Sequence, residues 1–143
     1  MPDDSERAVD AKYGAPGDVV SFADGYPVLV ANQGSLDDLN GRLETPASMR
    51  QFRPNLVVEG AGAWAEDAWT RVHAGDVTLR VVKPCDRCTV VTIDPDSDVP
   101  VARREPLATL AKLRARENKV YFGQNAVPET FGRLRVGDEV VAV

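Results

Sequence analysis

Short apolar runs separated by turn residues recur along most of this chain, and they predict strands far more often than helices. The runs are rich in valine and other β-branched or aromatic residues, and glycine, proline or aspartate bounds many of them. We predict strands or strand entrances at residues 19–22, 27–31, 52–58, 70–72, 77–82, 89–93, 120–122, 133–136 and 139–143. In this prediction residues 123–125 break one strand, and the last two runs form a closing hairpin. Gly-Asp turns at residues 75–76 and 137–138 favour a small barrel or a strongly curved sheet.

Helical periodicity is weaker and is confined to three stretches. Ser35 opens a capping box, with an acid three residues later, and leucines then repeat at helical spacing. Thr45, which a proline follows, predicts a second and brief helix over residues 47–51. The longest predicted helix runs from residue 105 to residue 116, and its leucine stripe is more typical of a core face than of a functional one. The fold is therefore expected to be mainly β (α+β).

The composition limits the kinds of protein that this chain can be. With 143 residues, 43% of them hydrophobic and 27% charged, it fits one soluble globular domain. No apolar run approaches the roughly 20 residues of a membrane span, and the N-terminus lacks the apolar core of a secretory signal. A net charge of −5 argues against nucleic-acid binding, and two cysteines make no disulfide framework, so the cytoplasm is the expected compartment. We expect a flexible leader over residues 1–17 and one domain over residues 18–143.

Both cysteines lie in one motif, KPCDRC, at residues 83–88. Because a strand-like run follows, Cys88 is expected at the mouth of a strand, where a thiolate can be aimed at a ligand. Lys83 and Arg87 would place positive charge near Cys88, which favours the thiolate form of a cysteine.

The motif alone leaves several interpretations open. A structural zinc site needs about four ligands, and beyond Cys85 and Cys88 the chain has a single histidine, His73. A thioredoxin-like redox pair would open a helix, whereas a strand-like run follows here. Two buried thiols that only pack are the simplest interpretation of the motif by itself. The remaining alternative is a single cysteine that binds a metal-bearing cofactor.

Two polar residues lie at the entrance of a predicted strand in the segment FRPNLVV, residues 52–58. The fork of the Arg53 guanidinium suits a phosphate, and the amide of Asn55 can bind the edge of a heterocycle. The ordinary alternatives are a salt bridge for Arg53 and a turn for Asn55. These two side chains are candidates for an anion or cofactor site.

An ordered series of short motifs resembles the MOSC domain, the domain found at the C-terminus of molybdenum cofactor sulfurase. The same domain forms the catalytic half of the mitochondrial amidoxime reducing component and of its bacterial relatives. Each motif is weak alone, but their order and spacing are specific, and the resemblance runs from about residue 19 to residue 143. The motifs are GYPVL (25–29), SLDDLN (35–40), FRPNLVV (52–58), AEDAW (65–69), KPCDRC (83–88), DPD (94–96), REPL (104–107), FGQN (122–125) and VGD (136–138).

The resemblance implies a MOSC-type curved β-barrel with a few short helices, and it implies roles for particular residues. Cys88 matches the catalytic thiolate that ligates molybdenum in the reducing component, whereas Cys85 matches a neighbour that is not a ligand. Arg53 matches an arginine that holds the molybdopterin, through its phosphate. The cofactor-binding positions implied in this way are Arg53, Asn55, Gly25, Tyr26, Asp67 and Asn125, with Glu66 as a weaker match.

The function implied by the resemblance is that of a domain that binds the molybdenum-molybdopterin cofactor. It would belong to an oxidoreductase that reduces N-hydroxylated small molecules with electrons from a partner of ferredoxin, flavoprotein or cytochrome b5 type. Neither nucleic acid nor a membrane is implied as a partner. The alternatives are a carrier of sulfur or of the cofactor without turnover, and a folded domain with a vestigial pocket. Family descriptions also mention pyridoxal phosphate, but no lysine here is a convincing Schiff-base site.

One departure from the family affects the expected activity. The full-length enzymes carry a β-rich domain ahead of this one, and its basic residues hold part of the anionic end of the cofactor. No segment before residue 19 resembles that domain. We therefore expect an open half-site that binds the cofactor more weakly than the full-length enzymes do.

Overall fold

The computed structural model describes residues 7–8, 19–20 and 26–143. The predictions made for Gly25 and for residues 21–22 lie outside the described residues. In the described part, seven strands join one sheet, and two further strands pair with each other. The strands are β1 (Arg7–Ala8), β2 (Val19–Val20), β3 (Val28–Asn32), β4 (Leu56–Val58), β5 (Arg71–Ala74), β6 (Val77–Asp86), β7 (Ala115–Arg116), β8 (Lys119–Pro128) and β9 (Val140–Ala142).

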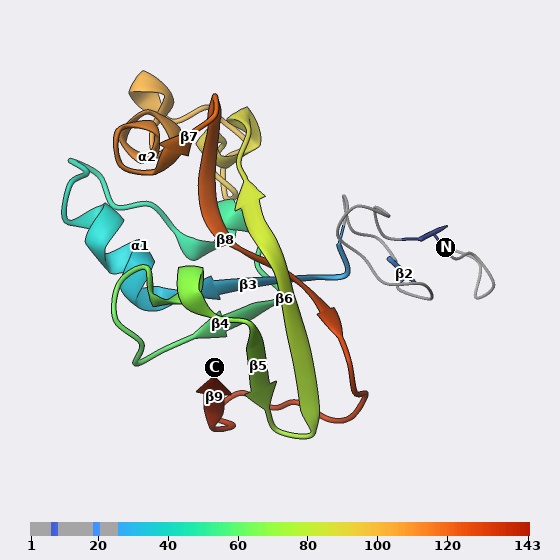
Figure 1. Cartoon of the computed structure of the whole chain (residues 1–143). Helices are drawn as coiled ribbons and strands as arrows, with labels where there is room; N and C mark the ends of the chain where they lie inside the picture. Colours follow the sequence, from blue (N-terminus) through green and yellow to red (C-terminus); the bar gives the residue numbers. More distant parts are fainter. Residues whose placement is uncertain (1–6, 9–18, 21–25) are drawn as a thin grey trace.

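The larger sheet has the strand order β4-β3-β8-β6-β5-β9, and β7 pairs with β8 beside it. The pair β3–β4 is parallel and the other pairs are antiparallel, so the sheet is mixed. It curls into a nearly closed barrel, in which the ten-residue strands β6 and β8 run the length of the molecule (Figure 1). The predicted fold class, a curved and mainly β barrel with a few short helices, is confirmed.

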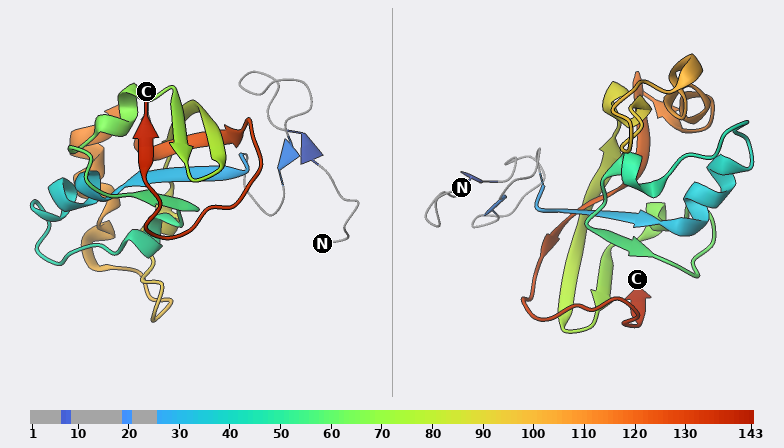
Figure 2. Two further views of the ribbon diagram at one scale, coloured as in Figure 1. Left: turned by 90° about the horizontal axis from the view of Figure 1, so that it is seen from below. Right: turned by 180° about the vertical axis from the view of Figure 1, so that it is seen from behind.

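Short helices and 3-10 turns cover one side of the barrel, and β5 and β9 lie at the other (Figure 2). The helical elements are α1 (Gln33–Asn40), α2 (Leu107–Arg114), η1 (Met49–Phe52), η2 (Ala65–Ala68), η3 (Thr89–Thr92) and η4 (Ala102–Arg104). Within the described ranges, no helix has the length and apolar character needed to span a membrane.

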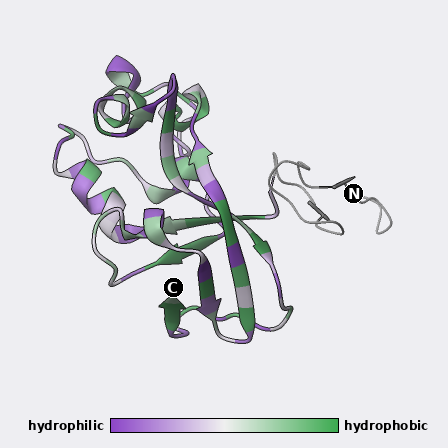
Figure 3. Ribbon diagram, in the orientation of Figure 1, coloured by the Kyte–Doolittle hydropathy of each residue, from purple (hydrophilic) through white to green (hydrophobic). Residues whose placement is uncertain are grey.

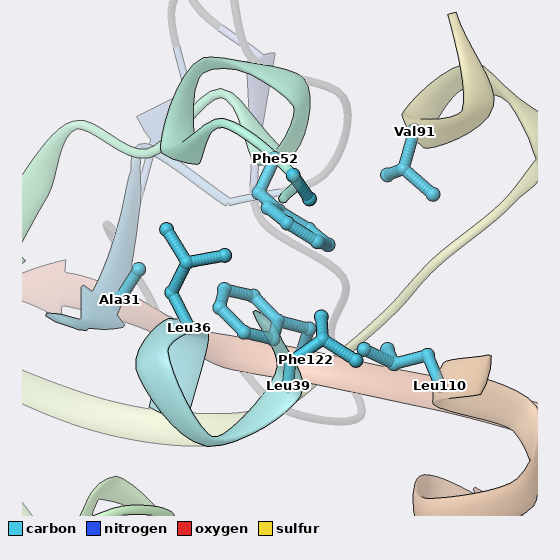
Figure 4. Packing of buried hydrophobic residues seen from close by; sticks show 8 residues of the cluster. Ala31, Leu36, Leu39, Phe52, Val91, Leu110 and Phe122 are labelled. Atoms are coloured by element: carbon cyan, nitrogen blue, oxygen red, sulfur yellow. The ribbon is translucent and has the colours of Figure 1, made fainter. Parts of the chain in front are cut away.

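The first of two hydrophobic clusters lies between the barrel and these helical elements, and we call it the helix-side core. Its buried residues are Ala31, Leu36, Leu39, Ala47, Phe52, Val91, Leu110 and Phe122. The ring of Phe52 stacks on that of Phe122 with centroids 4.0 Å apart (Figure 4). Trp64 meets Phe122 edge-on at 6.0 Å. An aromatic pair of this kind contributes about 0.5–1.5 kcal/mol beyond the burial of its area.

The second cluster, which we call the strand-side core, lies between strands. Its buried residues are Val30, Val58, Val72, Leu79 and Ala126. In β5, Val72 and Ala74 are buried whereas Arg71 and His73 are exposed, which is the alternation of a strand with one face in the core. Figure 3 shows polar and apolar segments alternating in the same way along β6.

Two predicted helix starts are wrong. The helix predicted to be capped by Ser35 begins earlier, at Gln33, because the side chain of Asn32 accepts a hydrogen bond from the Gly34 amide and caps it. Ser35 lies inside α1 and is buried. Thr45 is not a cap either, because the brief helix predicted over residues 47–51 is the 3-10 turn η1.

The cap of η1 is Ser48, and Gln51 completes a reciprocal capping box with it. The longer helix α2 is also shorter than the predicted 105–116, because residues 115–116 leave it and pair as β7.

The strand predicted over residues 89–93 is also wrong, since residues 89–92 form the 3-10 turn η3. Within the turn the Thr92 hydroxyl donates to the Thr89 carbonyl, 2.6 Å away, and from outside the Gln51 amide donates to the Val91 carbonyl at 2.9 Å. These contacts override the β preference of the branched side chains. Cys88 therefore precedes a 3-10 turn and does not open a strand.

The C-terminal third differs from prediction in two further ways. Residues 123–125 do not break a strand, because β8 continues through Gly123 with a φ of +79°. A Cβ there would lie 2.9 Å from the Val30 carbonyl oxygen, so glycine fits both the conformation and the close approach. The predicted closing hairpin is absent from the described chain, since residues 133–136 form no strand and β9 pairs with β5.

Candidate functional site

The two cysteines of the motif have different surroundings. Cys85 lies in β6 and is half-buried, and its Sγ accepts a hydrogen bond from Nη1 of Arg87 at 3.0 Å. Cys88 is exposed and occupies the position before η3 without a capping bond from its side chain. Both are free thiols. The side chain of Arg87 thus donates to Cys85, and the Lys83 ammonium lies 5.5 Å from the centre of the Tyr26 ring. Positive charge near Cys88 from these two groups stays a prediction.

Arg53 lies at the end of η1, exposed and in the left-handed region with a φ of +54°. The carbonyl of the preceding residue, Phe52, accepts a hydrogen bond from Nη2 of Arg87 at 2.7 Å. The residue that follows Arg87 is Cys88. Because the Gln51 amide also binds the Val91 carbonyl, η1 is bonded both to η3 and to the residue before Cys88. The thiol-bearing and guanidinium-bearing segments therefore lie together.

Asn55 has a structural contact of its own. Its Oδ1 accepts from the Leu29 amide at 2.7 Å, and its backbone amide donates to the Leu29 carbonyl at 2.9 Å. These two bonds hold the entrance of β4 against β3. The Nδ2 of Asn55 is the group that could contact a ligand.

Tyr26 and Asn125 lie near the same part of the sheet. The strand register aligns Leu29 of β3 with Asn125 of β8, and Asn125 with Lys83 of β6. Tyr26 is buried beneath the Lys83 ammonium. The structure therefore gathers Asn55, Asn125 and Tyr26 around the beginning of β3, while Gly25 is outside the described residues.

Asp67 is engaged elsewhere. Both of its carboxylate oxygens accept from Nη2 of Arg114, at 2.7 and 2.6 Å, and one also accepts from the Gln124 amide at 3.0 Å. The Arg114 guanidinium lies 4.5 Å from the centre of the Trp64 ring. These contacts join η2 to α2 and β8, so a cofactor contact for Asp67 stays a prediction.

Glu66, the weaker match beside Asp67, is buried. Its carboxylate accepts from the Ser35 hydroxyl at 2.7 Å and from the Asn32 amide at 2.9 Å. The network joins the first turn of α1 to η2. Glu66 therefore has a structural role near the helix-side core, and a cofactor contact for it stays a prediction.

The ligand set for a metal is small. Among the described residues, no group of three or more histidine, cysteine, aspartate or glutamate side chains could hold a metal ion. Cys88 offers one exposed thiol, and Arg53 offers a guanidinium on the adjoining segment. This set fits a group that brings most of its own metal ligands together with an anionic tail, and it does not fit a closed zinc site.

Two cavities of the described surface lie apart from Cys88 and Arg53. One of about 630 Å³ opens beside the motif, and its lining is Lys83, Pro84, Asp86, Arg116, Glu117, Lys119 and Tyr121. Its charges partly cancel, since Lys119 lies 3.4 Å from Asp86. A second of about 250 Å³ is mostly apolar and includes Asn55. We place the candidate site at Cys88 and Arg53, because neither cavity contains a thiol.

Several contacts that shape the site were missed by the sequence analysis. The spacing of Ser48 and Gln51 is that of a capping box and could have revealed η1. The pairing of Arg114 with Asp67 joins residues far apart in the chain and leaves no local signal. Arg87 and Cys85 are two residues apart at the end of a strand, where such side chains point to the same side, so that contact could have been expected.

Comparison with known proteins adds a family match. The family model of the MOSC domain matches residues 17–141. The human mitochondrial amidoxime-reducing component 1 is 42% identical over 133 residues, which cover 87% of this chain and 39% of that protein. Mitochondrial amidoxime reducing component 2 of Bos taurus is 39% identical over 129 residues, which cover 85% of this chain and 38% of that protein. The chain thus spans about two fifths of the length of these curated relatives.

A solved structure supports the fold independently. YiiM from Geobacillus stearothermophilus superposes with a TM-score of 0.57 over 82% of this chain and 54% of that chain. Sequence identity between the two is 18%, so this similarity concerns the fold alone.

Proposed function

Because this chain belongs to the MOSC domain family, we propose that it holds a molybdenum-molybdopterin cofactor through Cys88 and forms the cofactor-bearing part of an oxidoreductase. The observation that carries the proposal is the exposed Cys88 thiol on a segment joined to the Arg53 turn. A thiolate is a soft ligand of the class that suits such metal centres. The Arg53 guanidinium can bind a phosphate through paired, charge-assisted hydrogen bonds.

The proposed substrates are small N-hydroxylated molecules. Such a substrate would take up two electrons and two protons, its N–O bond would break, and the oxygen would leave as water. The cofactor would supply the oxygen-atom chemistry when bound, and this chain would hold and orient it. The names of the curated relatives describe amidoxime reduction by those proteins, which supports this class of substrate.

Electrons would come from a redox partner of ferredoxin, flavoprotein or cytochrome b5 type. The described chain offers two free thiols and no cluster of metal-ligating side chains that could serve as an electron-transfer centre. Free thiols are also stable in a reducing compartment, and we propose the cytoplasm. The names of the curated relatives place those proteins in mitochondria.

The proposal is tested by elemental analysis of protein purified from a host that makes the molybdenum cofactor. We expect molybdenum in the wild type and in Cys85→Ser, none in Cys88→Ser, and a reduced amount in Arg53→Met. Zinc measured in the same samples controls for non-specific metal uptake. Equal loss in both cysteine variants, or no molybdenum in any sample, would contradict the proposal.

A second candidate is a carrier that holds sulfur or the cofactor for transfer without turnover. The exposure of Cys88 favours it, because a transferred group must reach another protein. Sulfur released from Cys88 by cyanide would support the carrier. Reduction of benzamidoxime with a chemical electron donor would support the enzyme.

A further inference from the structure

Arg87 connects the two segments of the candidate site, and its guanidinium has three neighbours. Nη1 donates to the Cys85 thiol at 3.0 Å, and Nη2 donates to the Phe52 carbonyl at 2.7 Å. The guanidinium carbon lies 5.6 Å from the centre of the Phe52 ring, within the range of a cation–π contact. Its Nε is buried and has no hydrogen-bond partner among the described residues. These contacts fix the plane and the position of the group.

The contact with Phe52 bears directly on Arg53. A residue other than glycine in the left-handed region costs about 1–2 kcal/mol, so surrounding contacts must hold it there. From inside the turn, the Arg53 amide donates to the Arg50 carbonyl at 3.2 Å. From outside, Arg87 holds the Phe52 carbonyl, which belongs to the peptide group that leads into Arg53. The direction of the Arg53 side chain therefore depends on Arg87.

The contact with Cys85 ties the Arg87 guanidinium to strand β6. Cys85 lies in β6 at a register shift, and its two neighbours pair with β8: Pro84 with Gln124 and Asp86 with Tyr121. These flanking pairs hold its backbone on the sheet. Cys88 follows Arg87 directly and has no side-chain capping bond to hold it. Its carbonyl accepts from the Val91 amide at 3.3 Å, and Gln51 of η1 donates to the Val91 carbonyl at 2.9 Å. Arg87 and this Gln51 bond together place Cys88 relative to η1 and Arg53.

We propose that Arg87 is a positioning residue that holds the Arg53 guanidinium beside the Cys88 thiol, and that Cys85 serves as its acceptor on the sheet. This inference rests on the proposed function, in which Cys88 is the ligand of the cofactor. It gives the second cysteine of the motif, Cys85, a role that is not ligation. Arginine is required because two acceptors in different directions need a planar fork, which the single ammonium of lysine does not provide.

The test compares two alkylating reagents on the cofactor-free protein. Iodoacetate is an anion and iodoacetamide is neutral. The rate of alkylation of Cys88 by iodoacetate, divided by its rate with iodoacetamide, therefore rises with positive charge near that thiol; we call this quotient the rate ratio. Trypsin cleaves after Arg87 and also after lysine at that position, so Cys85 and Cys88 fall in separate peptides and mass spectrometry can quantify each. Molybdenum content is measured in parallel on protein from a cofactor-producing host.

We expect the rate ratio at Cys88 to fall about two- to fivefold in Arg87→Lys and in Arg53→Met, the size expected for one unit charge a few ångströms away in water. Arg116→Lys is the matched control, because Arg116 is exposed and lies over the Tyr121 ring, away from the bonds described above. Its ratio should equal that of the wild type. Thermal unfolding of each variant confirms that the folded protein is compared.

The outcomes separate this inference from the proposed function. An unchanged ratio in Arg87→Lys, with a lowered ratio in Arg53→Met, would overturn the positioning role. An unchanged ratio in both variants would show that Arg53 does not lie beside Cys88 and would overturn it as well. A lowered ratio in both, with no molybdenum in the wild type, would support the positioning role while the proposed function fails. If Arg87→Lys does not fold, Cys85→Ala removes one of its contacts and should lower the ratio in the same direction.

Discussion

The strand-side core takes each of its buried residues from a strand. The helix-side core collects its residues from two strands, two helices, two 3-10 turns and the loop at Ala47. Hydrogen bonds between strands hold together the backbone segments that carry the strand-side core. The helix-side core is held mainly by side-chain packing, above all by the stack of Phe52 on Phe122. The candidate site lies on the helix side, since Phe52 precedes Arg53 and Val91 belongs to the turn after Cys88. The candidate site thus lies in the part of the molecule that regular secondary structure supports least.

The largest expected changes in the free energy of unfolding come from truncating one buried side chain in each core. Phe122→Ala should destabilise the protein by about 3–5 kcal/mol, because it removes both aromatic contacts and leaves a cavity. Leu79→Ala in the strand-side core should cost about 2–5 kcal/mol. Urea unfolding measures both. In the folded fraction, we expect the rate ratio at Cys88 to change in Phe122→Ala and not in Leu79→Ala, and the same change in both would contradict the separation.

A smaller effect is expected from the buried carboxylate beneath α1. Ser35→Ala removes one donor to Glu66 and leaves the carboxylate partly unsatisfied, at a cost of about 1–3 kcal/mol. Glu66→Gln keeps the size of the side chain but removes its charge, and it places an amide against the donors from Ser35 and Asn32. Chemical denaturation of the two single variants and the double variant gives the coupling energy. Strict additivity would show that the two side chains do not act as one network.

The cap of η1 offers a more local change. Ser48→Ala should cost about 1 kcal/mol, because the Arg50 amide loses its side-chain acceptor and half of the capping box is removed. Ser48→Asn should restore most of the loss, since asparagine is also a good cap. The midpoint of urea unfolding measures both variants. A neutral Ser48→Ala would show that the remaining bonds of Gln51, from the backbone amide of residue 48 and to the Val91 carbonyl, hold the turn without the hydroxyl.

The smallest effects concern two carboxylates, one in each region: Glu129, which is exposed, and Asp94, which is half-buried. On the strand side, the hydrogen bond from Arg71 holds the pKa of Glu129 below its ordinary value. On the helix side, the Asp96 backbone amide and then Ser97 lower the pKa of Asp94. Each carboxylate has a lower pKa in the folded protein than in the unfolded chain, so its ionised form stabilises the fold. This contribution to the free energy of unfolding is fully present above the ordinary pKa of about 4. It is lost as the pH falls through the lower, folded-state pKa.

Melting temperatures of Glu129→Gln and Asp94→Asn at several pH values check this expectation. Both variants should melt below the wild type at pH 7, and each difference should disappear in acid below about pH 4. High salt should reduce the Glu129 difference more, because an exposed ion pair is screened whereas a backbone hydrogen bond is not. A difference that persists unchanged into acid would contradict the assigned cause.

The same two regions show how much the sequence could predict. The apolar runs over residues 27–31 and 77–82 lie in β3 and β6, because alternation and β-branched side chains agree there with the pairing of the strands. On the helix side, residues 89–93 have the same composition and form no strand. The contact that decides their structure is the bond from Gln51 to Val91, forty residues apart in the chain, which no local pattern records.

The candidate site was predicted as a set of residues and not as an arrangement. The motifs named Cys88 and Arg53, and the structure shows that their segments lie together. The motifs did not show that Arg87 contacts Cys85, or that the carboxylate of Asp67 is bound by Arg114. The pairing of Asp67 with Arg114 depends on the long-range packing of α2, which has no signal in short windows of sequence. The contact of Arg87 with Cys85 spans two residues and could have been expected from their spacing.

The place of β8 in the sheet bears on how the chain is made in the cell. β8 lies between the β3–β4 pair and the β5–β6 pair, and it joins two halves that are otherwise not hydrogen-bonded in the described sheet. The strands β3, β4, β5 and β6 all precede β8 in the chain and are therefore synthesised before it. Until then β3 and β6 each present an open edge, the feature that recruits unwanted strands from other chains. Closure of this barrel is therefore a late step of translation, and the nascent chain needs protection until residues 119–128 have emerged.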